Sequence, residues 1–257
     1  MRICHLLLTR FNIQYEPNET SGINPTWLDE RLQLFEQYCL PSVKNQSCND
    51  FIWLLFCDIR TPEKYKRIIN LYKTQIPQLR VYWLPYHTND YYDVFTDLGK
   101  EYAQGYDLLV TSRIDNDDSI AYNYIELVQK AAHEGILGII SFPEGKQTFI
   151  LKNKSYDVRY LQNHFTSRIE NATFETILVL NHRLISTHDI TAIETQEPMW
   201  EEIVHNCNMY NDYTPAYHYY VKNLSDFTDI LRRWMRHQAK HLANFWTFIL
   251  KHTDKAH

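Results

Sequence analysis

The hydrophobic positions of this chain form short continuous runs that alternate with amphipathic stretches. The runs are too short for helices and are typical of buried strands; they cover residues 2–8, 51–57, 79–83 and 108–110. The stretches between them carry apolar residues at helical spacing, at residues 27–38, 61–72 and 91–104. Strands that alternate with helices predict a mostly parallel sheet with right-handed crossovers.

Capping and turn residues set the expected ends of these helices. Pro41 and the segment Asn45-Gln-Ser47 should close the first helix, because proline interrupts helical hydrogen bonding and short polar residues favour turns. Thr61 should cap the second helix, with Pro62 in its first turn, and Gly105 should end the third.

The pattern is less regular after residue 120. Four segments have an expected structure: a helix at 122–133, a strand at 135–142, one arm of a hairpin at 145–151 and a strand at 176–180. Residues 197–206 fit a strand or a helix equally well, and the sequence leaves both open.

The composition limits the classes of protein to which the chain can belong. At 257 residues the chain can bury a sizeable core. The net charge of -5 argues against nucleic-acid binding through an overall positive field. The 5 cysteines form no Cys-x-x-Cys pair, which favours reduced, mostly buried thiols in a cytosolic protein. No segment has the roughly 18 apolar residues that a membrane span needs.

An acid cluster follows the central strand: Asp115, Asp117 and Asp118, with Asn116 among them. If the strand continues to residue 114, Asp115 and Asp117 lie on the same side of the chain. Carboxylates so close repel one another unless a cation or protons lie between them, and such oxygen ligands suit Mg²⁺ or Mn²⁺. We expect the cluster at the surface of a cleft, where Asp117→Ala would leave folding intact.

Two other interpretations of the cluster stay open. It has the ligand spacing of a calcium loop, although Ile120 occupies the position of the loop glycine and a strand precedes it. Alternatively, it is a solvated acidic turn in which Asp118 or Ser119 caps the helix that follows.

Polar side chains also follow other predicted strands. Thr9, Arg10 and Asn12 come at the end of the first strand, and Asp58 at the end of the second. Ligands of open α/β sheets bind outside the carboxyl ends of the strands, so these residues are placed to contact one. Arg10 and Arg113 could face phosphates or pair with carboxylates, and Asp58 could contact a nucleoside or cap its own turn.

Six segments occur in an order that matches one family. They are Thr9-Arg-Phe-Asn12, Trp27-Leu-x-x-Arg31, the strand ending in Asp58, Arg113-Ile-Asp-Asn-Asp-Asp118, Pro198-Met-Trp200 and Val204-His205-x-x-Asn208. Together they resemble a bacterial family of rhamnosyltransferases related to GT-A glycosyltransferases, over residues 1–210. The pattern departs from the family at Asn206, where a glycine is expected, and in the acidic pair Glu201 and Glu202.

The resemblance implies a GT-A-like fold, with a mostly parallel central sheet flanked by helices. The domain would cover residues 1–222, with a nucleotide-binding half at 1–120 and an acceptor half at 121–222. The activity implied is transfer of an activated deoxy-sugar, with dTDP-rhamnose as a candidate donor, to a growing cell-surface glycan.

An inverting transfer needs a cationic site for the leaving diphosphate. Asp115 and Asp117 are the candidate ligands for Mn²⁺ or Mg²⁺, and His205 could add a third from the second half of the chain. His205 could equally be hydrogen-bonded structure. The residues expected to bind the nucleotide sugar are Thr9, Arg10, Asn12, Asp58, Arg113 and Asp115.

The same reaction needs a base for the acceptor hydroxyl. Glu197, Glu201 and Glu202 are candidates, and which of them faces the pocket depends on whether the segment is strand or helix. Trp200 could stack on an acceptor sugar or belong to the core.

The last segment, residues 223–257, is expected to form a basic amphipathic helical tail. Between residues 231 and 251 apolar residues recur at helical spacing, and Lys and Arg occur without Asp or Glu. Such a helix can lie on an anionic membrane surface, or its apolar side can pack on protein. We expect a cytoplasmic enzyme, with peripheral contact at the inner face of the membrane as one option and a lipid-linked glycan as a possible acceptor.

Two other functions stay open from the residues alone. A metal-dependent phosphohydrolase or nucleotidyltransferase could use the same acid cluster, but would need further carboxylates on neighbouring strand ends, where only Asp58 is obvious. A non-catalytic sugar- or nucleotide-binding protein is the third alternative.

Overall fold

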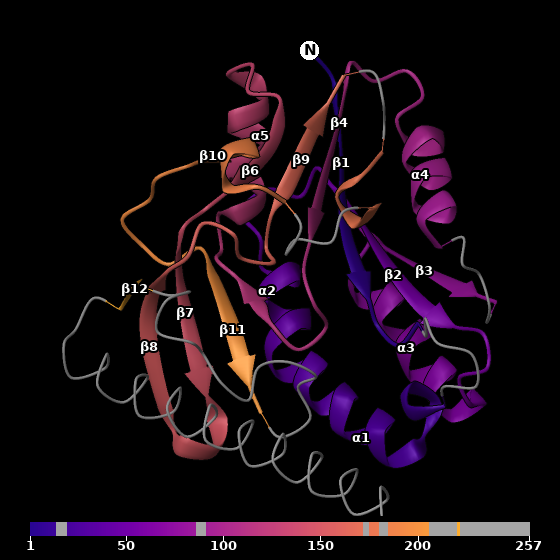
Figure 1. Ribbon diagram of the computed structural model, residues 1–257. Helices are drawn as coiled ribbons and strands as arrows, with labels where there is room; N and C mark the ends of the chain where they lie inside the picture. Colours follow the sequence, from indigo (N-terminus) through magenta and orange to yellow (C-terminus); the bar gives the residue numbers. More distant parts are fainter. Residues whose placement is uncertain (14–19, 86–90, 172–174, 180–184, 206–219, 222–257) are drawn as a thin grey trace, which may run out of the picture.

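Two sheets form the framework of the protein, whose computed structural model describes residues 1–13, 20–85, 91–171, 175–179, 185–205 and 220–221 (Figure 1). The larger sheet has seven strands in the order β10-β6-β9-β4-β1-β2-β3. Its strands are β1 (Ile3–Arg10), β2 (Ile52–Asp58), β3 (Leu79–Leu84), β4 (Leu108–Arg113), β6 (Gly138–Ser141), β9 (Ser167–Glu170) and β10 (Ile190–Ala192).

The centre of the larger sheet is parallel. Strand β1 pairs in parallel with both β2 and β4, and β2 pairs in parallel with β3. Strand β9 is inserted between β4 and β6 and runs antiparallel to both. Every residue of β4 is buried, as expected for a strand covered on two faces. The predicted α/β class, with a mostly parallel central sheet flanked by helices, is confirmed and agrees with the GT-A-like architecture that the resemblance implies.

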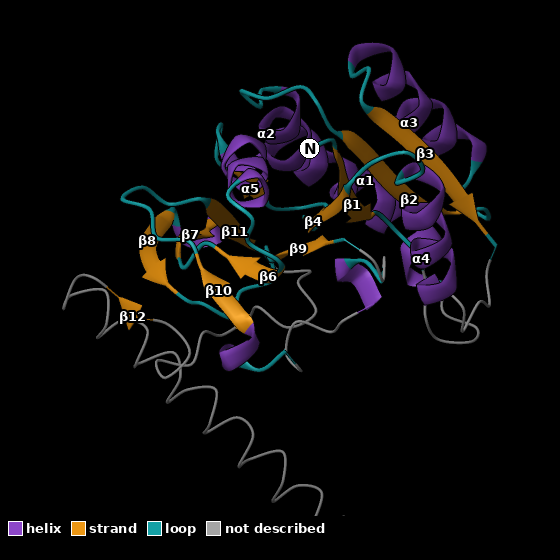
Figure 2. Cartoon of the chain, turned by 90° about the horizontal axis from the view of Figure 1, so that it is seen from above, coloured by secondary structure: helices purple, strands orange, loops and turns teal. Residues whose placement is uncertain are grey.

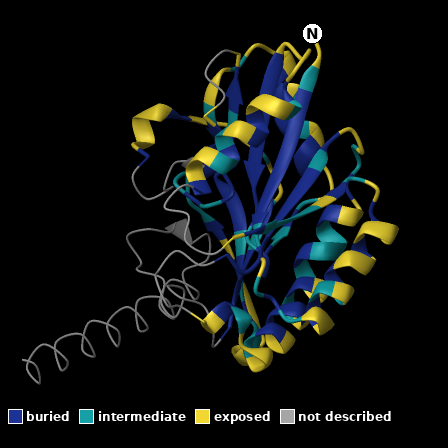
Figure 3. Cartoon of the chain, turned by 90° about the vertical axis from the view of Figure 1, so that its right-hand side faces the viewer, coloured by how far each residue is buried: buried dark blue, intermediate teal, exposed yellow. Residues whose placement is uncertain are grey.

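Helices cover both faces of the larger sheet (Figure 2). One face carries α1 (Pro25–Leu34), α2 (Leu40–Lys44), α3 (Glu63–Gln75) and α5 (Tyr124–His133), and the other carries α4 (Tyr91–Tyr102). On the α4 side, the rings of Phe56 and Phe95 lie 4.7 Å apart. The strands are buried along most of their length, and exposed residues follow the outer sides of the helices (Figure 3).

The first helical stretch does not end where proline predicts. Helix α1 continues into a π-helical turn, η2 (Phe35–Cys39), and then into α2, so Pro41 lies inside the stretch. Proline has no N–H to donate, and its ring crowds the preceding turn. The wider π-helical turn directly before it accommodates this conflict, and the chain stays helical to Lys44.

Two other local expectations are wrong. Pro62, not Thr61, occupies the cap of α3, and the hydroxyl of Thr61 donates to the backbone carbonyl of Asp58 at 2.6 Å. Residues 177–179 form a 3₁₀ turn, η4 (Ile177–Val179), instead of a strand. Strand β9 already occupies the position beside β4, and the backbone N–H of Ile177 donates to the Thr111 hydroxyl at 2.9 Å.

The smaller sheet has five strands in the order β12-β8-β7-β11-β5. They are β5 (Ser119–Ile120), β7 (Glu144–Phe149), β8 (Lys154–Arg159), β11 (Trp200–Val204) and β12 (Tyr220–Val221). Strands β7 and β8 form the predicted hairpin, which turns through η3 (Ile150–Lys152). Strand β11 pairs in parallel with β7, which decides the open choice at residues 197–206 in favour of a strand.

Some expectations fall outside the described residues. The tail at 223–257 and the departure at Asn206 belong to this group. In the part of the chain that the structure describes, the cysteines are free, with Cys4, Cys39 and Cys57 buried, in agreement with reduced thiols. Within the same part, no helix has the length and apolar character needed to cross a membrane.

A buried polar network joins the central strands. Gln129 donates to Nδ1 of His5 at 3.4 Å, so Nε2 of His5 carries the proton and faces the Ser112 hydroxyl at 2.9 Å. Ser112 and Ser167 hydroxyls lie 2.6 Å apart, and the Tyr124 hydroxyl lies 3.2 Å from Ser167. Because every member has a partner, the network can occupy the interior without the penalty of an unsatisfied polar group.

This network is expected to make the fold sensitive to acid. Burial lowers the pKa of His5 from 6.5 to about 3, so in that window the ring is neutral in the folded chain and charged in the unfolded chain. The free energy of unfolding should therefore be highest above pH 6.5 and decrease below it, by up to about 1.4 kcal/mol per pH unit from this group. His5→Gln, which keeps a donor for Ser112, should show a shallower decrease in urea unfolding. Equal slopes for the two proteins would contradict this assignment.

Candidate active site

The acid cluster lies directly after the end of β4 and is hydrogen-bonded to the backbone at the end of β1. Asn116 Nδ2 donates to the backbone carbonyl of Phe11, and to that of Arg10 at 3.3 Å. The cluster thus lies at the carboxyl ends of parallel strands, the edge at which open α/β sheets bind ligands. A strand precedes the cluster, so it is not an EF-hand. Nor does it cap α5, because Asn123 holds that position.

Asp117 contacts an arginine and a histidine from other parts of the chain. Its Oδ2 accepts from Nη1 of Arg31 on α1 at 2.5 Å and lies 2.8 Å from Nε2 of His205. All three side chains are about nine-tenths buried. Arg31 also donates to the side-chain carbonyl of Asn116 at 2.8 Å. The structure therefore brings Asp117 and His205 together, as the sequence predicts, but with a guanidinium already bound to the carboxylate.

Asp118 is fully enclosed and pairs with a histidine that follows β8. Its Oδ2 lies 2.8 Å from Nε2 of His164, and its Oδ1 accepts the backbone N–H of Ile203 at 2.8 Å. Burial and the neighbouring charge of Asp117 raise the pKa of Asp118, and the hydrogen bond from His164 opposes this. Burial would lower the pKa of His164, but the hydrogen bond and charge of Asp118 outweigh it and raise that pKa. One proton thus lies between Asp118 and His164, and a cation held by both side chains would replace it.

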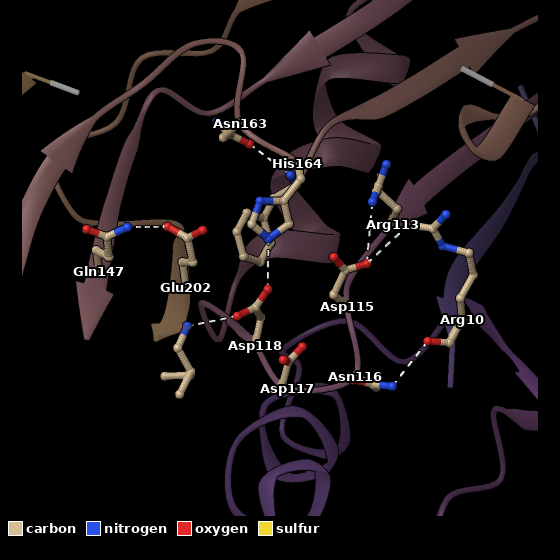
Figure 4. Close-up of polar contacts among 12 residues, drawn as sticks. Arg10, Arg113, Asp115, Asn116, Asp117, Asp118, Gln147, Asn163, His164 and Glu202 are labelled. Carbon is tan, nitrogen blue, oxygen red and sulfur yellow. Dashed lines mark hydrogen bonds and ion pairs between the residues drawn. The ribbon is translucent and has the colours of Figure 1, made fainter. Parts of the chain in front are cut away.

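Asp115 is the most exposed member of the cluster, with 37% of its side chain accessible. Two arginines flank it: Arg113 Nη2 donates to its Oδ1 at 3.4 Å, and Arg10 Nη2 lies 3.8 Å away. One oxygen each of Asp115 and Asp118 and a ring nitrogen of His164 lie within 4.8 Å of one another (Figure 4). In the described part of the chain, no other group of three His, Cys, Asp or Glu residues has its ligand atoms so close.

This arrangement differs from the expectation that Asp115 and Asp117 face the same side. Strand β4 ends at Arg113, and the turn that follows sends the three carboxylates to different partners. Asp118, not Asp117, shares with Asp115 the group of three potential ligands. A strand-like alternation therefore does not apply to residues 115–118.

The three candidate bases have different surroundings. Glu202 is 3% exposed, accepts from Gln147 Nε2 at 2.7 Å, and lies on the His164 side of β11 (Figure 4). Glu201 points to the opposite face, where the Thr148 and Ser119 hydroxyls donate to it at 2.5 and 3.2 Å. Glu197 is exposed and precedes the strand. Of the three, only Glu202 lies close enough to raise the pKa of His164 through its charge.

Trp200 belongs to the core, which corrects the prediction that it stacks on an acceptor sugar. Its indole is 2% exposed, stacks on Phe165 with ring centroids 5.0 Å apart, and donates to the Phe142 carbonyl at 2.8 Å. Gly145 lies against it so closely that a Cβ there would be 2.1 Å from the indole. The ring has no face open to a ligand.

Three residues expected to bind the nucleotide sugar instead form buried hydrogen bonds and an ion pair within the protein. The Thr9 hydroxyl accepts from Trp53 Nε1 at 2.9 Å, and Thr9 is fully buried. Asn12 bridges the Thr61 hydroxyl at 2.9 Å and the backbone N–H of Asp58 at 3.0 Å. The Asp58 carboxylate is occupied by Arg60, with Nη2 to Oδ2 at 2.7 Å. Arg10, Arg113 and Asp115 thus stay as the candidates for donor contacts.

Two site residues escaped the sequence analysis. His164 lies in a stretch without clear periodicity, and no local signal marked it. A charged residue in an amphipathic helix is expected on its polar side, yet only 9% of Arg31 is exposed, and its guanidinium lies 4.9 Å from the centre of the Trp27 ring. Its place in the segment Trp27-Leu-x-x-Arg31 was the one signal that could have identified it.

Solved structures with a related arrangement have very low sequence identity to this chain. S. aureus TarS is 11% identical, with a TM-score of 0.46 over 79% of this chain and 37% of that chain. S. aureus TarS 1–349 in complex with UDP-GlcNAc is 10% identical, with a TM-score of 0.43 over 90% of this chain and 65% of that one. The chain thus spans less than two thirds of either TarS chain. A 4-diphosphocytidyl-2C-methyl-D-erythritol synthase is 12% identical, with a TM-score of 0.33 over 72% of this chain and 81% of that one.

Sequence families give a clearer result. No curated protein matches the chain. Residues 7–217 match the family described as "Putative rhamnosyl transferase", which covers most of the 257 residues and includes β1, the acid cluster and β11. The chain therefore belongs to this rhamnosyl transferase family.

Proposed function

We propose that the protein transfers a deoxyhexose, with rhamnose as the leading candidate, from a nucleoside diphosphate donor to a glycan acceptor, with inversion and with the help of a divalent cation. The group of Asp115, Asp118 and His164 carries this proposal, because its ligand atoms lie within 4.8 Å at the carboxyl edge of the sheet. The family supports the sugar, and dTDP-rhamnose is the candidate donor.

The residues of this group fit a divalent cation. Asp118 Oδ2 and His164 Nε2 are 2.8 Å apart, close to the roughly 3 Å between adjacent corners of an octahedron with bonds of about 2.1 Å. Two carboxylates and an imidazole suit Mn²⁺ better than Mg²⁺, which prefers oxygen ligands only. The Asp117–His205 pair has the same spacing, but Arg31 already neutralises that carboxylate at 2.5 Å.

Each remaining group has a part in the proposed reaction. A bound cation would offset the charge of the departing diphosphate. Arg10 and Arg113, on either side of Asp115, would contact the diphosphate oxygens. Glu202 would accept the proton of the acceptor hydroxyl, so that the hydroxyl can attack the anomeric carbon from the side opposite the leaving group.

The halves at residues 1–120 and 121–222 would bind donor and acceptor respectively, with the acid cluster at their boundary. A location in the cytoplasm, with a lipid-linked glycan as acceptor at the membrane, would suit the basic tail. A two-metal phosphohydrolase is less favoured, because Asp58, its candidate second carboxylate, is bound by Arg60.

Two histidines distinguish the positions that the cation could take. His164→Gln is expected to weaken Mn²⁺ binding, measured by isothermal titration calorimetry, by at least about tenfold, because one of the protein ligands is lost. His205→Gln should change the affinity little. Retained Mn²⁺ binding in His164→Gln with loss in His205→Gln would instead place the ion at Asp117 and His205, two of the three ligands predicted from the sequence, the third being Asp115.

Turnover tests the function itself. The purified chain is expected to release the nucleoside diphosphate from dTDP-rhamnose in the presence of Mn²⁺ and a glycan acceptor, and EDTA should stop the reaction. A panel of other nucleotide sugars serves as the control for the donor. Two results would contradict the proposal. One is a turnover rate that is the same with and without EDTA, and the other is release of phosphate from substrates that contain no sugar.

A further inference from the structure

A groove lies beside the acid cluster, between α1 and the tip of the β7–β8 hairpin. It encloses about 270 Å³. One wall comes from α1, with Trp27, Arg31 and Leu34, and from η2, with Gln37, and the opposite wall includes Leu151 of η3. His205, which follows β11, also lines it. In Figure 1, the carboxyl end of β11 points toward α1.

The lining combines apolar and hydrogen-bonding side chains. Trp27, Leu34 and Leu151 offer apolar surface, and Gln37 offers both a donor and an acceptor. A pyranose likewise has both apolar and hydrogen-bonding surface: C–H groups lie on its faces, and hydroxyls lie around its rim. Sites for small ligands typically pair apolar walls with a few polar groups that fix the orientation.

Charge in the groove is largely balanced within the protein. Arg31 and His205 both lie against the carboxylate of Asp117, at 2.5 and 2.8 Å. Glu30 adds a carboxylate to the lining. An anionic ligand would meet no excess of positive charge, so the groove suits a neutral sugar better than a phosphate or an acidic sugar.

The groove is also connected to the candidate active site. Asp117, the partner of two lining residues, is the immediate neighbour of Asp118, and Asp118 belongs to the proposed cation site. The groove and the donor edge are therefore separated by a single buried ion-pair cluster.

We propose that this groove binds a neutral pyranose unit of the acceptor glycan. The inference rests on the proposed function, since it assigns a substrate to the same active site. It adds a place for the acceptor on the α1 side of the acid cluster, lined by side chains other than the candidate bases Glu197, Glu201 and Glu202. Trp27 and Gln37 would contact the sugar, and Leu151 would limit the width of the groove.

The test uses neutral methyl glycosides as probes of the full chain without any donor. Saturation-transfer NMR with methyl α-L-rhamnopyranoside, methyl β-D-galactopyranoside and methyl β-D-glucopyranoside should detect binding of at least one of them to the wild-type protein. Leu151→Trp, which fills the groove from an exposed position, should raise the dissociation constant at least about tenfold. Leu71→Trp is the matched control, because Leu71 is an equally exposed leucine on α3 and lies outside the groove.

The outcomes separate this inference from the proposed function. No glycoside binding by the wild-type chain, equal binding by Leu151→Trp, or tighter binding of methyl β-D-glucuronide than of the neutral glycosides would each overturn it. Mn²⁺ binding at Asp115, Asp118 and His164 is measured independently. A chain that binds Mn²⁺ but no glycoside would therefore refute the groove alone, and one that binds glycosides but no Mn²⁺ would refute the cation site alone.

Discussion

Glu202→Gln is expected to lower turnover by about a hundredfold or more, with little change in the affinity for the donor. The substitution keeps the shape of the side chain and the hydrogen bond with Gln147, which is 2.7 Å in the wild-type protein. It removes the ability to accept a proton, and general bases contribute about a hundredfold to ten-thousandfold to enzymatic rates. Steady-state kinetics with separate variation of donor and acceptor would show a decrease in kcat with KM for the donor preserved.

The other two glutamates provide matched controls. Glu201→Gln changes a side chain one position along the same strand but on the opposite face, where Ser119 and Thr148 hydroxyls bind it. Glu197→Gln changes an exposed residue before the strand. Both variants should keep turnover within about threefold of the wild type. If Glu201→Gln shows the large decrease and Glu202→Gln does not, the base is assigned to the wrong face of β11.

Asp117→Ala is expected to lower the free energy of unfolding by about 3 kcal/mol or more, because it leaves the buried guanidinium of Arg31 without its carboxylate. This corrects the expectation from the sequence that the variant folds normally. The sequence places Asp117 at the surface of a cleft, but only 11% of its side chain is exposed. Transfer should be lost as well, because His205 loses the same partner. Urea unfolding gives the stability, and activity is assayed well below the unfolding midpoint.

Two further variants show whether the buried charge is the cause. Adding Arg31→Met to Asp117→Ala removes both charges, so the double variant should recover part of the lost stability. Asp29→Ala breaks the exposed pair with Lys64, whose side chains are 53% and 66% accessible, and should leave the unfolding midpoint unchanged. A stable Asp117→Ala, or a double variant less stable than the single one, would contradict this account.

Local sequence pattern determined most of the framework. The apolar runs that became β1, β2 and β4 are continuous because a central parallel strand is covered on both faces, and β3, at the edge of the sheet, is only partly buried. Helices α3, α4 and α5 followed from their spacing, and the β7–β8 hairpin from two neighbouring runs. The position of the acid cluster after a buried strand likewise followed from the order of residues. These features depend on contacts between residues close in sequence or on the burial of whole segments. Both are visible in the order of apolar and polar residues along the chain.

Tertiary structure decided which partners each side chain meets. Asp115, Asp117 and Asp118 are adjacent in sequence, yet they pair with Arg113, with Arg31 and His205, and with His164. No linear pattern specifies a contact between residues 31 and 117, or between 117 and 205. The same limit applies to the insertion of β9 beside β4, which joins residues about sixty positions apart.

The two candidate bases illustrate the physical reason. Glu201 and Glu202 are the same residue type at neighbouring positions, so composition and spacing cannot rank them. Pairing of β11 with β7 fixes its register, and in a strand successive side chains point to opposite faces. The chemistry of each glutamate is therefore determined by a hydrogen-bonded partner some fifty residues away along the chain, and only the folded chain contains that information.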